Sequence, residues 1–187
     1  MAFEARVFVN SGRDSGTVHA ELLVSNNGRV IAIGNARGHG DIGAPYRAIA
    51  DGLDKFIDAI EAAGSAAEEH RDDPPVDDPL RVFEWSDRAF LEGDGLQACG
   101  FEVVALSPID HRLLGAGAAA VCADIELSDG DEAIGISTSF DVDEGSSETV
   151  AVFSRLRDAI RAMLAAIEEA TEVVKSWQEP EEKGKAE

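Results

Sequence analysis

Apolar and polar residues alternate along several short stretches of the chain, a pattern typical of half-buried β-strands. In the first third of the sequence this alternation covers residues 4–10, 17–25 and 29–33. The last two stretches are joined by Asn27-Gly28, a dipeptide that favours tight hairpins because both residues tolerate positive φ. The pattern therefore predicts an antiparallel meander of three strands.

A glycine-rich segment follows and leads into a helix. Residues 34–43 contain four glycines, which permit close approach of a ligand or a second chain to the backbone. Across residues 46–60 the apolar positions recur at intervals of three and four, and charged residues take the other face, which indicates an amphipathic helix. Pro45 suits the first turn of this helix, and Asp41 or Gly43 can cap it.

The next segment changes in composition. Residues 64–79 are acidic and contain three of the six prolines, which predicts an exposed linker. The aromatic-rich residues 80–91 fit either a short strand or a helix.

Strand-like alternation then returns at residues 101–107, late in residues 115–127, and at residues 133–140. An apolar stripe from Val152 to Trp177 predicts a second helix about 45 Å long at 1.5 Å per residue. Such a helix is longer than a small sheet covers, so we expect its far end to pack on another chain.

The order of these elements predicts an α+β fold made of two βββα units. Each unit is expected to have an antiparallel three-stranded sheet, with the helices packed on one face. The predicted boundaries are 1–64 for the first unit, 65–96 for the acidic linker and connecting segment, 97–177 for the second unit, and 178–187 for a charged, disordered tail.

The charge balance excludes two classes of partner. The chain of 187 residues has 37 acidic and 16 basic residues, a net charge of −21. Such a field repels nucleic-acid phosphates and anionic membranes, so we expect neither as a partner. The acidity fits a solvated, halophilic-like surface, a carboxylate surface that mimics nucleic acid, or a cation-binding surface.

The remaining features favour a cytoplasmic protein without catalytic chemistry. Residues 1–10 lack the pattern of a signal peptide, and no apolar run approaches the ~20 residues of a membrane span. Cys99 and Cys122 have no CxxC spacing and lie in apolar contexts, which predicts two buried free thiols in a reducing compartment. The histidines show no HxxxH spacing and no serine lies in a GxSxG motif, so we expect no enzyme, no metal site and no cofactor.

The start of the first helix resembles a motif of a known family. Residues 38–49, GHGDIGAPYRAI, are similar to the GNGPxxAxxxA segment in the C-terminal regulatory domain of 2-isopropylmalate synthase and its citramalate synthase relatives, which also has a tandem βββα order. His39 stands at the usual asparagine of the motif and Asp41 at its proline. The residues that match the motif are Gly38, Gly40, Ala44 and Ala48.

The resemblance implies a free-standing relative of that regulatory module, which in the family dimerises and binds a branched amino-acid effector between its units. We therefore expect a homodimer with a small amino-acid-like effector, whose carboxylate would be favoured by free N–H groups at the helix start. The expected effector contacts are Gly38, His39, Gly40, Asp41, Ile42 and Ala44. A plain strand-to-helix connection is the alternative for this loop, and an acidic module that binds a basic partner protein is the alternative for the function.

Overall fold

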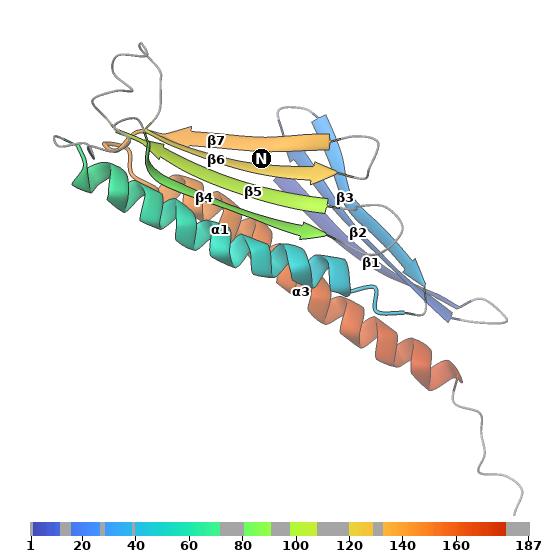
Figure 1. The fold of residues 1–187 in the computed structure, drawn as a ribbon. Helices are drawn as coiled ribbons and strands as arrows, with labels where there is room; N and C mark the ends of the chain where they lie inside the picture. Colours follow the sequence, from blue (N-terminus) through green and yellow to red (C-terminus); the bar gives the residue numbers. More distant parts are fainter. Residues whose placement is uncertain are drawn as a thin grey trace, which may run out of the picture.

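The computed structural model describes residues 2–11, 16–26, 29–38, 40–71, 81–90, 98–107, 120–128 and 133–178. The described part holds seven β-strands and two α-helices (Figure 1). The strands are β1 (Ala2–Ser11), β2 (Gly16–Asn26), β3 (Arg29–Gly38), β4 (Arg81–Phe90), β5 (Ala98–Leu106), β6 (Val121–Ser128) and β7 (Ala133–Phe140). The helices are α1 (Ala44–Glu69) and α3 (Ser147–Gln178). The expectation of an α+β fold with two helices and two antiparallel sheets is confirmed.

The strands form one sheet in the order β1-β2-β3 and a second in the order β4-β5-β6-β7. The second βββα unit and its three-stranded sheet are wrong, because the aromatic-rich segment of undecided type forms β4 and pairs antiparallel with β5, so this half of the chain has four strands before its helix. Phe83 and Trp85 pack against the core, whereas Arg81 and Glu84 are exposed. This half-buried edge strand carries so many charged residues that its alternation is weak in the sequence.

Each helix packs mainly against the sheet of the other half of the chain. Helix α1 contacts β4 and β5, helix α3 contacts β1 and β2, and the two helices contact each other. Figure 1 shows both helices on the same side of the two sheets. The two halves of the chain therefore share one continuous hydrophobic core.

The packing of α3 on the first sheet explains the length of this helix. The far end of the helix is covered by the first sheet of the same chain, since Val174 and Trp177 lie against Gly16 of β2. A Cβ on Gly16 would lie 2.8 Å from Cε3 of Trp177. The sequence did not reveal this cover because it does not show which sheet each helix packs on, and the packing of another chain on the far end stays a prediction.

The core centres on an aromatic cluster where both helices meet the second sheet. The ring centroid of Phe56 in α1 lies 5.0 Å from that of Phe153 in α3, 5.5 Å from Phe101 in β5 and 6.3 Å from Trp85 in β4. Edge-on and tilted ring pairs of this kind add to the stability from apolar burial. Near the start of α1, the buried hydroxyl of Tyr46 donates a hydrogen bond of 3.0 Å to the carbonyl of Ala20 in β2.

Two boundaries differ from those expected. Strand β3 continues to Gly38, through a β-bulge at which Glu21 pairs with Asn35 and Leu22 with Ile33. The bulge absorbs the extra residue Gly34, so the first half of the glycine-rich segment is strand. Helix α1 runs to Glu69 and takes in residues 65–69, the start of the expected linker. Residues 72–80, 91–97 and 179–187, which hold the rest of the linker, part of the connecting segment and most of the tail, lie outside the described residues.

Candidate functional site

The loop between β3 and α1 is a short turn held by its own backbone. The N–H of Ile42 donates to the carbonyl of Gly40 at 3.0 Å, and the N–H of Ala44 donates to that of Asp41 at 3.3 Å. Gly43 is the N-cap of α1 and offers no side-chain hydrogen bond. The carboxylate of Asp41 pairs with the guanidinium of Arg47 instead of capping the helix.

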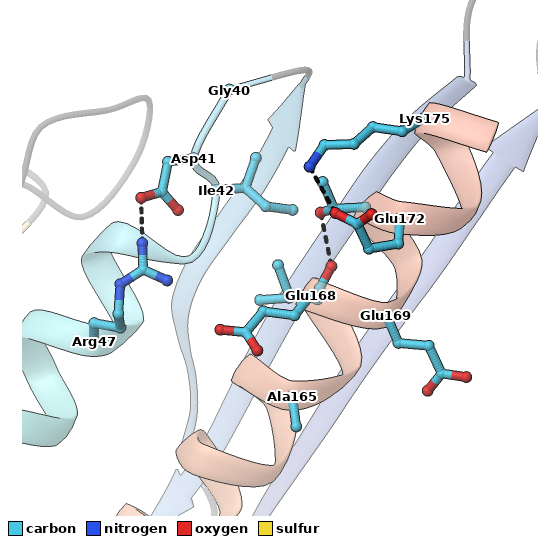
Figure 2. A pocket seen from close by; sticks show the side chains of 11 residues that line it. Gly40, Asp41, Ile42, Arg47, Ala165, Glu168, Glu169, Glu172 and Lys175 are labelled. Carbon is cyan, nitrogen blue, oxygen red and sulfur yellow. Dashed lines mark hydrogen bonds and ion pairs between the residues drawn. The ribbon is translucent and has the colours of Figure 1, made fainter. Parts of the chain in front are cut away.

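A groove with a volume of about 790 Å³ lies between this loop and the C-terminal half of α3 (Figure 2). It exists because α1 begins at Ala44, whereas α3 continues to Gln178. The two elements meet where Gly43 approaches Leu164, since a Cβ on Gly43 would lie 3.3 Å from a methyl group of Leu164. Beyond that point α3 has no neighbouring helix on this side in the described part of the chain, and the groove occupies the space.

The groove has an apolar floor and a charged rim. Ile42 and Ile167 contribute buried side chains to the floor, with exposed fractions of 8% and 3%. The hydroxyl of Thr171 donates a hydrogen bond of 2.7 Å to the carbonyl of Ile167 and is turned toward its own helix. The charged lining residues are Asp41, Arg47, Glu168, Glu169, Glu172 and Lys175.

Carboxylates outnumber cations in this lining. Arg47 is paired with Asp41, and the ammonium of Lys175 lies 2.6 Å from a carboxylate oxygen of Glu172. In Figure 2 the side chain of Glu168 extends toward the α1 side of the groove, whereas that of Glu169 points away. The partners in both ion pairs are exposed to solvent, and surface pairs of this kind contribute about 0–1 kcal/mol. Both pairs can therefore open at low cost to meet a charged ligand.

The structure brings half of the sequence-predicted site residues to the groove. Gly40, Asp41 and Ile42 line it. Gly38 ends β3 and Ala44 is the exposed first residue of α1, and neither is among the lining residues. His39 lies outside the described residues.

The sequence analysis did not identify the groove residues that α3 contributes. Glu168, Glu172 and Lys175 follow one another at helical spacing and so share a face, and the sequence analysis singled out none of them. Their spacing was a usable signal for a charged stripe. Nothing in the sequence indicated that this stripe would lie opposite the Gly40–Ile42 turn.

A second hollow, of about 620 Å³, lies on the outer face of the four-stranded sheet. Gly100 and Gly135 help to form it because they place no side chain on this face. Its charged lining residues are Asp87, Arg88, Glu102, Asp124 and Glu126. Like the groove, this surface carries more carboxylates than cations.

The two cysteines differ in their surroundings. Cys99 is fully buried, and this burial raises the pKa of its thiol to about 12. Cys122 is exposed, which corrects the expectation that both thiols are buried. Burial of part of the side chain and the negative charge of Asp124 raise the pKa of Cys122. The two residues sit at positions of opposite alternation on neighbouring strands, so their side chains emerge on different faces of the sheet.

Comparison of the chain with protein-family models, curated proteins and solved structures gives no match. Within the described residues, no group of three or more His, Cys, Asp or Glu side chains could hold a metal ion. Neither α1 nor α3 contains an apolar stretch long enough to cross a membrane, as far as the described part of the chain extends. The case for a function therefore rests on the geometry of the groove.

Proposed function

We propose that the protein is a non-catalytic regulatory module that dimerises and binds a small amino-acid-like effector in the groove. The observation that carries this proposal is the combination of an apolar floor with both signs of charge in one hollow of about 790 Å³. Ligand sites are typically apolar hollows with a few polar groups that fix orientation. The resemblance of the loop to a regulatory-domain motif supports the same function, although the second sheet has four strands and not three.

An amino acid fits the charges of the groove in one orientation. Its ammonium group would lie near Glu168, and its carboxylate would take a cation from one of the two surface pairs, Arg47 or Lys175. An apolar side chain would then lie on Ile42 and Ile167. A ligand bound in this way touches both the start of α1 and the far end of α3. It would stabilise the arrangement of the two helices, which is the expected action of a regulatory effector.

The groove lining favours binding over catalysis. No histidine, cysteine or serine is among its lining residues in the described part of the chain. The hydroxyl of Thr171 is engaged by its own helix, so no nucleophile lies beside a base. Free thiols at Cys99 and Cys122 are consistent with a reducing compartment, and we place the protein in the cytoplasm.

A thermal-shift screen tests the proposal. The panel contains α-amino acids, the matching 2-oxo acids, which lack the ammonium group, and the matching amines, which lack the carboxylate. We expect an amino acid with an apolar side chain to raise the melting temperature most, because a ligand at 100 times its Kd adds about 2.7 kcal/mol to the free energy of unfolding. A panel in which no compound shifts the melting temperature would contradict the proposal.

Two glutamates supply a matched pair of variants for the screen. Glu168→Gln removes the carboxylate that reaches toward the α1 side, whereas Glu169→Gln removes one that points away. We expect Glu168→Gln to reduce the ligand-induced shift several-fold and Glu169→Gln to leave it nearly unchanged. If both variants reduce the ligand-induced shift equally, the ligand responds to the net negative charge of the protein and not to the carboxylate of Glu168.

The second candidate function is an acidic module that binds a basic partner protein. The observation that favours it is the outer face of the four-stranded sheet, where Glu102, Asp124 and Glu126 surround the second hollow. A lysine-rich peptide should then bind with an affinity that falls steeply with salt, as expected for charge-steered association. Glu102→Gln should weaken this binding, and Glu168→Gln should not. The converse result would place the basic peptide in the groove.

A further inference from the structure

The large apolar side chains that are exposed in the described part of the chain lie at one edge of the first sheet, on both of its faces. On β1 these are Phe8 and Val9, with exposed fractions of 48% and 40%; on α3 they are Val173 and Trp177, with 39% and 49%. Val9, Val173 and Trp177 form a patch on the helix-covered face, because Val9 pairs with the buried Val18, whereas Phe8 points to the outer face beside His19. Helix α3 packs on β1 and β2, and Trp177 lies against Gly16, whose partner across the ladder is the last residue of β1. Scattered exposed apolar residues need no explanation, but a contiguous patch marks an interaction surface.

This patch is separate from the groove. Val173 and Trp177 are four residues apart and so share one flank of α3. Glu168, Glu172 and Lys175 of the groove lie on the opposite flank, because each residue turns the helix by about 100°. Of the groove residues, Glu169 at the rim shares the flank of Val173. A partner on the patch would therefore leave the groove open.

The neighbouring strand β1 is an edge strand without the usual protection. Among the strands that the structure describes it pairs with β2 alone, through an unbroken register from Ala2↔Ser25 to Ser11↔Gly16. Natural edge strands are normally protected by prolines, bulges or repeated charges. Strand β1 has no proline and no bulge, whereas the edge strand β4 has a register shift near Arg81 and four charged residues.

The charges on β1 are self-complementary. Glu4 and Arg6 have opposite signs, lie on the same outer face and are joined by hydrogen bonds of 2.7 and 2.8 Å. If two copies of β1 pair antiparallel about a two-fold axis at Ala5, Glu4 stands opposite the partner's Arg6 and Arg6 stands opposite the partner's Glu4. Opposite charges in this cross-strand position attract, although a chain of net charge −21 repels its copy elsewhere.

We propose that β1 and the exposed flank of α3 form the interface with a second copy of this chain. The β1 strands pair antiparallel about a two-fold axis at Ala5 and join the first sheets of both copies into one continuous sheet. Both α3 helices then lie on the same face of that sheet, and the Val173 and Trp177 flank of each copy lies at its own end of the seam, beside the start of the other copy's β1. The interface is isologous, as closed dimers require. It specifies the homodimer of the proposed function and does not depend on the effector groove.

The test is the molar mass from light scattering at about 0.15 M salt, where the Debye length is about 8 Å. We expect the native chain to be a dimer. Glu4→Arg and Arg6→Glu each place like charges across the seam and should raise the dimer Kd roughly tenfold or more. Glu4→Arg also lowers the net negative charge of the chain. If only general repulsion between the copies mattered, this variant would dimerise more tightly, whereas the proposed seam predicts a weaker dimer.

The molar mass of a mixture of the Glu4→Arg and Arg6→Glu variants is the decisive measurement. A chain with arginine at both positions meets a chain with glutamate at both positions, so an equimolar mixture should recover the dimer as a heterodimer. An effect confined to one chain, such as loss of its own Glu4–Arg6 pair, cannot be rescued in this way. Arg88→Glu on β4 is the matched control, since it makes the same charge change on another edge and should leave the mass unchanged.

Three results would overturn the interface: a monomeric native chain at micromolar concentration, single variants that dimerise normally, or a mixture that stays monomeric. The effector screen is run on the same variants to separate the two proposals. Monomeric Glu4→Arg and Arg6→Glu chains should keep the ligand-induced thermal shift, because both residues are remote from the groove lining. If the native chain dimerises but no compound raises its melting temperature, the effector proposal is wrong and the interface proposal stands.

Discussion

Gly52 of α1 lies directly against the ring of Phe101 in β5. A Cβ on Gly52 would be 2.6 Å from Cζ of Phe101 and closer still to Cε2. The ring cannot yield, because Phe101 is 3% exposed and packs against Phe56 at a centroid distance of 5.5 Å. The distance between α1 and the second sheet is therefore set by the absence of a side chain at this one helical position.

We predict that Gly52→Ala destabilises the protein. Alanine is the better helix former by about 1 kcal/mol, so an unpacked helix would gain stability from the change. Here the methyl group overfills the core at a cost of about 1–3 kcal/mol, and the net loss should be up to about 2 kcal/mol. Urea unfolding followed by circular dichroism measures this difference directly.

Gly64 provides the matched control in the same helix. A Cβ there would meet Phe140 and Ser146 no closer than 3.7 Å, which is ordinary van der Waals contact. Gly64→Ala should therefore raise the free energy of unfolding by up to about 1 kcal/mol. If both variants shift stability in the same direction, the close packing of α1 on β5 is wrong.

The sequence predicted most elements of the fold but not their packing. Alternation located β1, β2, β6 and β7 to within a few residues, and helical spacing located the start of α1 closely but that of α3 only to within about five residues. Periodicity shows that a face is buried and does not show which element covers it. Helix α1 covers the second sheet and helix α3 the first because of contacts between residues far apart in the sequence. The contact between Gly52 and Phe101 is an example.

The candidate site was predicted on one side only. Gly40, Asp41 and Ile42 could be singled out because glycine, proline and helix-capping signals mark the start of a helix. The stripe of Glu168, Glu172 and Lys175 carries no such local signal. It became part of a groove only because α3 extends past the start of α1.

An ion-pair cluster between the two helices should oppose the general effect of the acidic charge. Asp54 of α1 pairs with Arg161 of α3 and lies 3.3 Å from a guanidinium nitrogen of Arg157. We predict that Asp54→Asn lowers the free energy of unfolding by about 0.5–1 kcal/mol, since these groups are partly exposed and screened. Asp58→Asn, at an exposed position of the same helix, should instead be neutral or slightly stabilising because it reduces the net negative charge.

Urea unfolding of both variants at low and high salt checks this contrast. The loss in Asp54→Asn should shrink toward zero at about 1 M salt, where the Debye length is about 3 Å. A loss that persists at high salt would mean that Asp54 acts through packing rather than charge.

The two thiols should differ sharply in reactivity. In the native protein at neutral pH, a thiol reagent should modify Cys122 and spare Cys99 until the chain unfolds. Modification of Cys122 should be slower than that of free cysteine, because its raised pKa lowers the thiolate fraction. Mass spectrometry of the labelled peptides identifies the site. Labelling of Cys99 at the rate of Cys122 would contradict the burial of β5 beneath α1.

The buried Cys99 also predicts a pH dependence of stability. Its pKa is about 12 in the folded state, against an unperturbed value of 9.0. Between these values the unfolded chain has lost the thiol proton while the folded chain keeps it, so the free energy of unfolding falls as pH rises, by up to about 1.4 kcal/mol per pH unit. Cys99→Ala should flatten this slope above pH 9 in denaturant titrations. If the free energy of unfolding falls equally with pH in the native protein and in Cys99→Ala, Cys99 is not the cause of the pH dependence.

The net charge of −21 predicts that potassium chloride stabilises the native chain. Raising the salt from about 0.1 to 1 M shortens the Debye length from about 10 to 3 Å and screens the repulsion among the acidic residues. The same screening weakens the surface ion pairs, but each of these contributes only about 0–1 kcal/mol, so relief of repulsion should dominate. We expect the melting temperature to rise with potassium chloride. Sucrose, which favours compact states without screening charge, serves as the comparison. A melting temperature that rises with sucrose but stays constant or falls with potassium chloride would show that charge repulsion does not limit the stability of this protein.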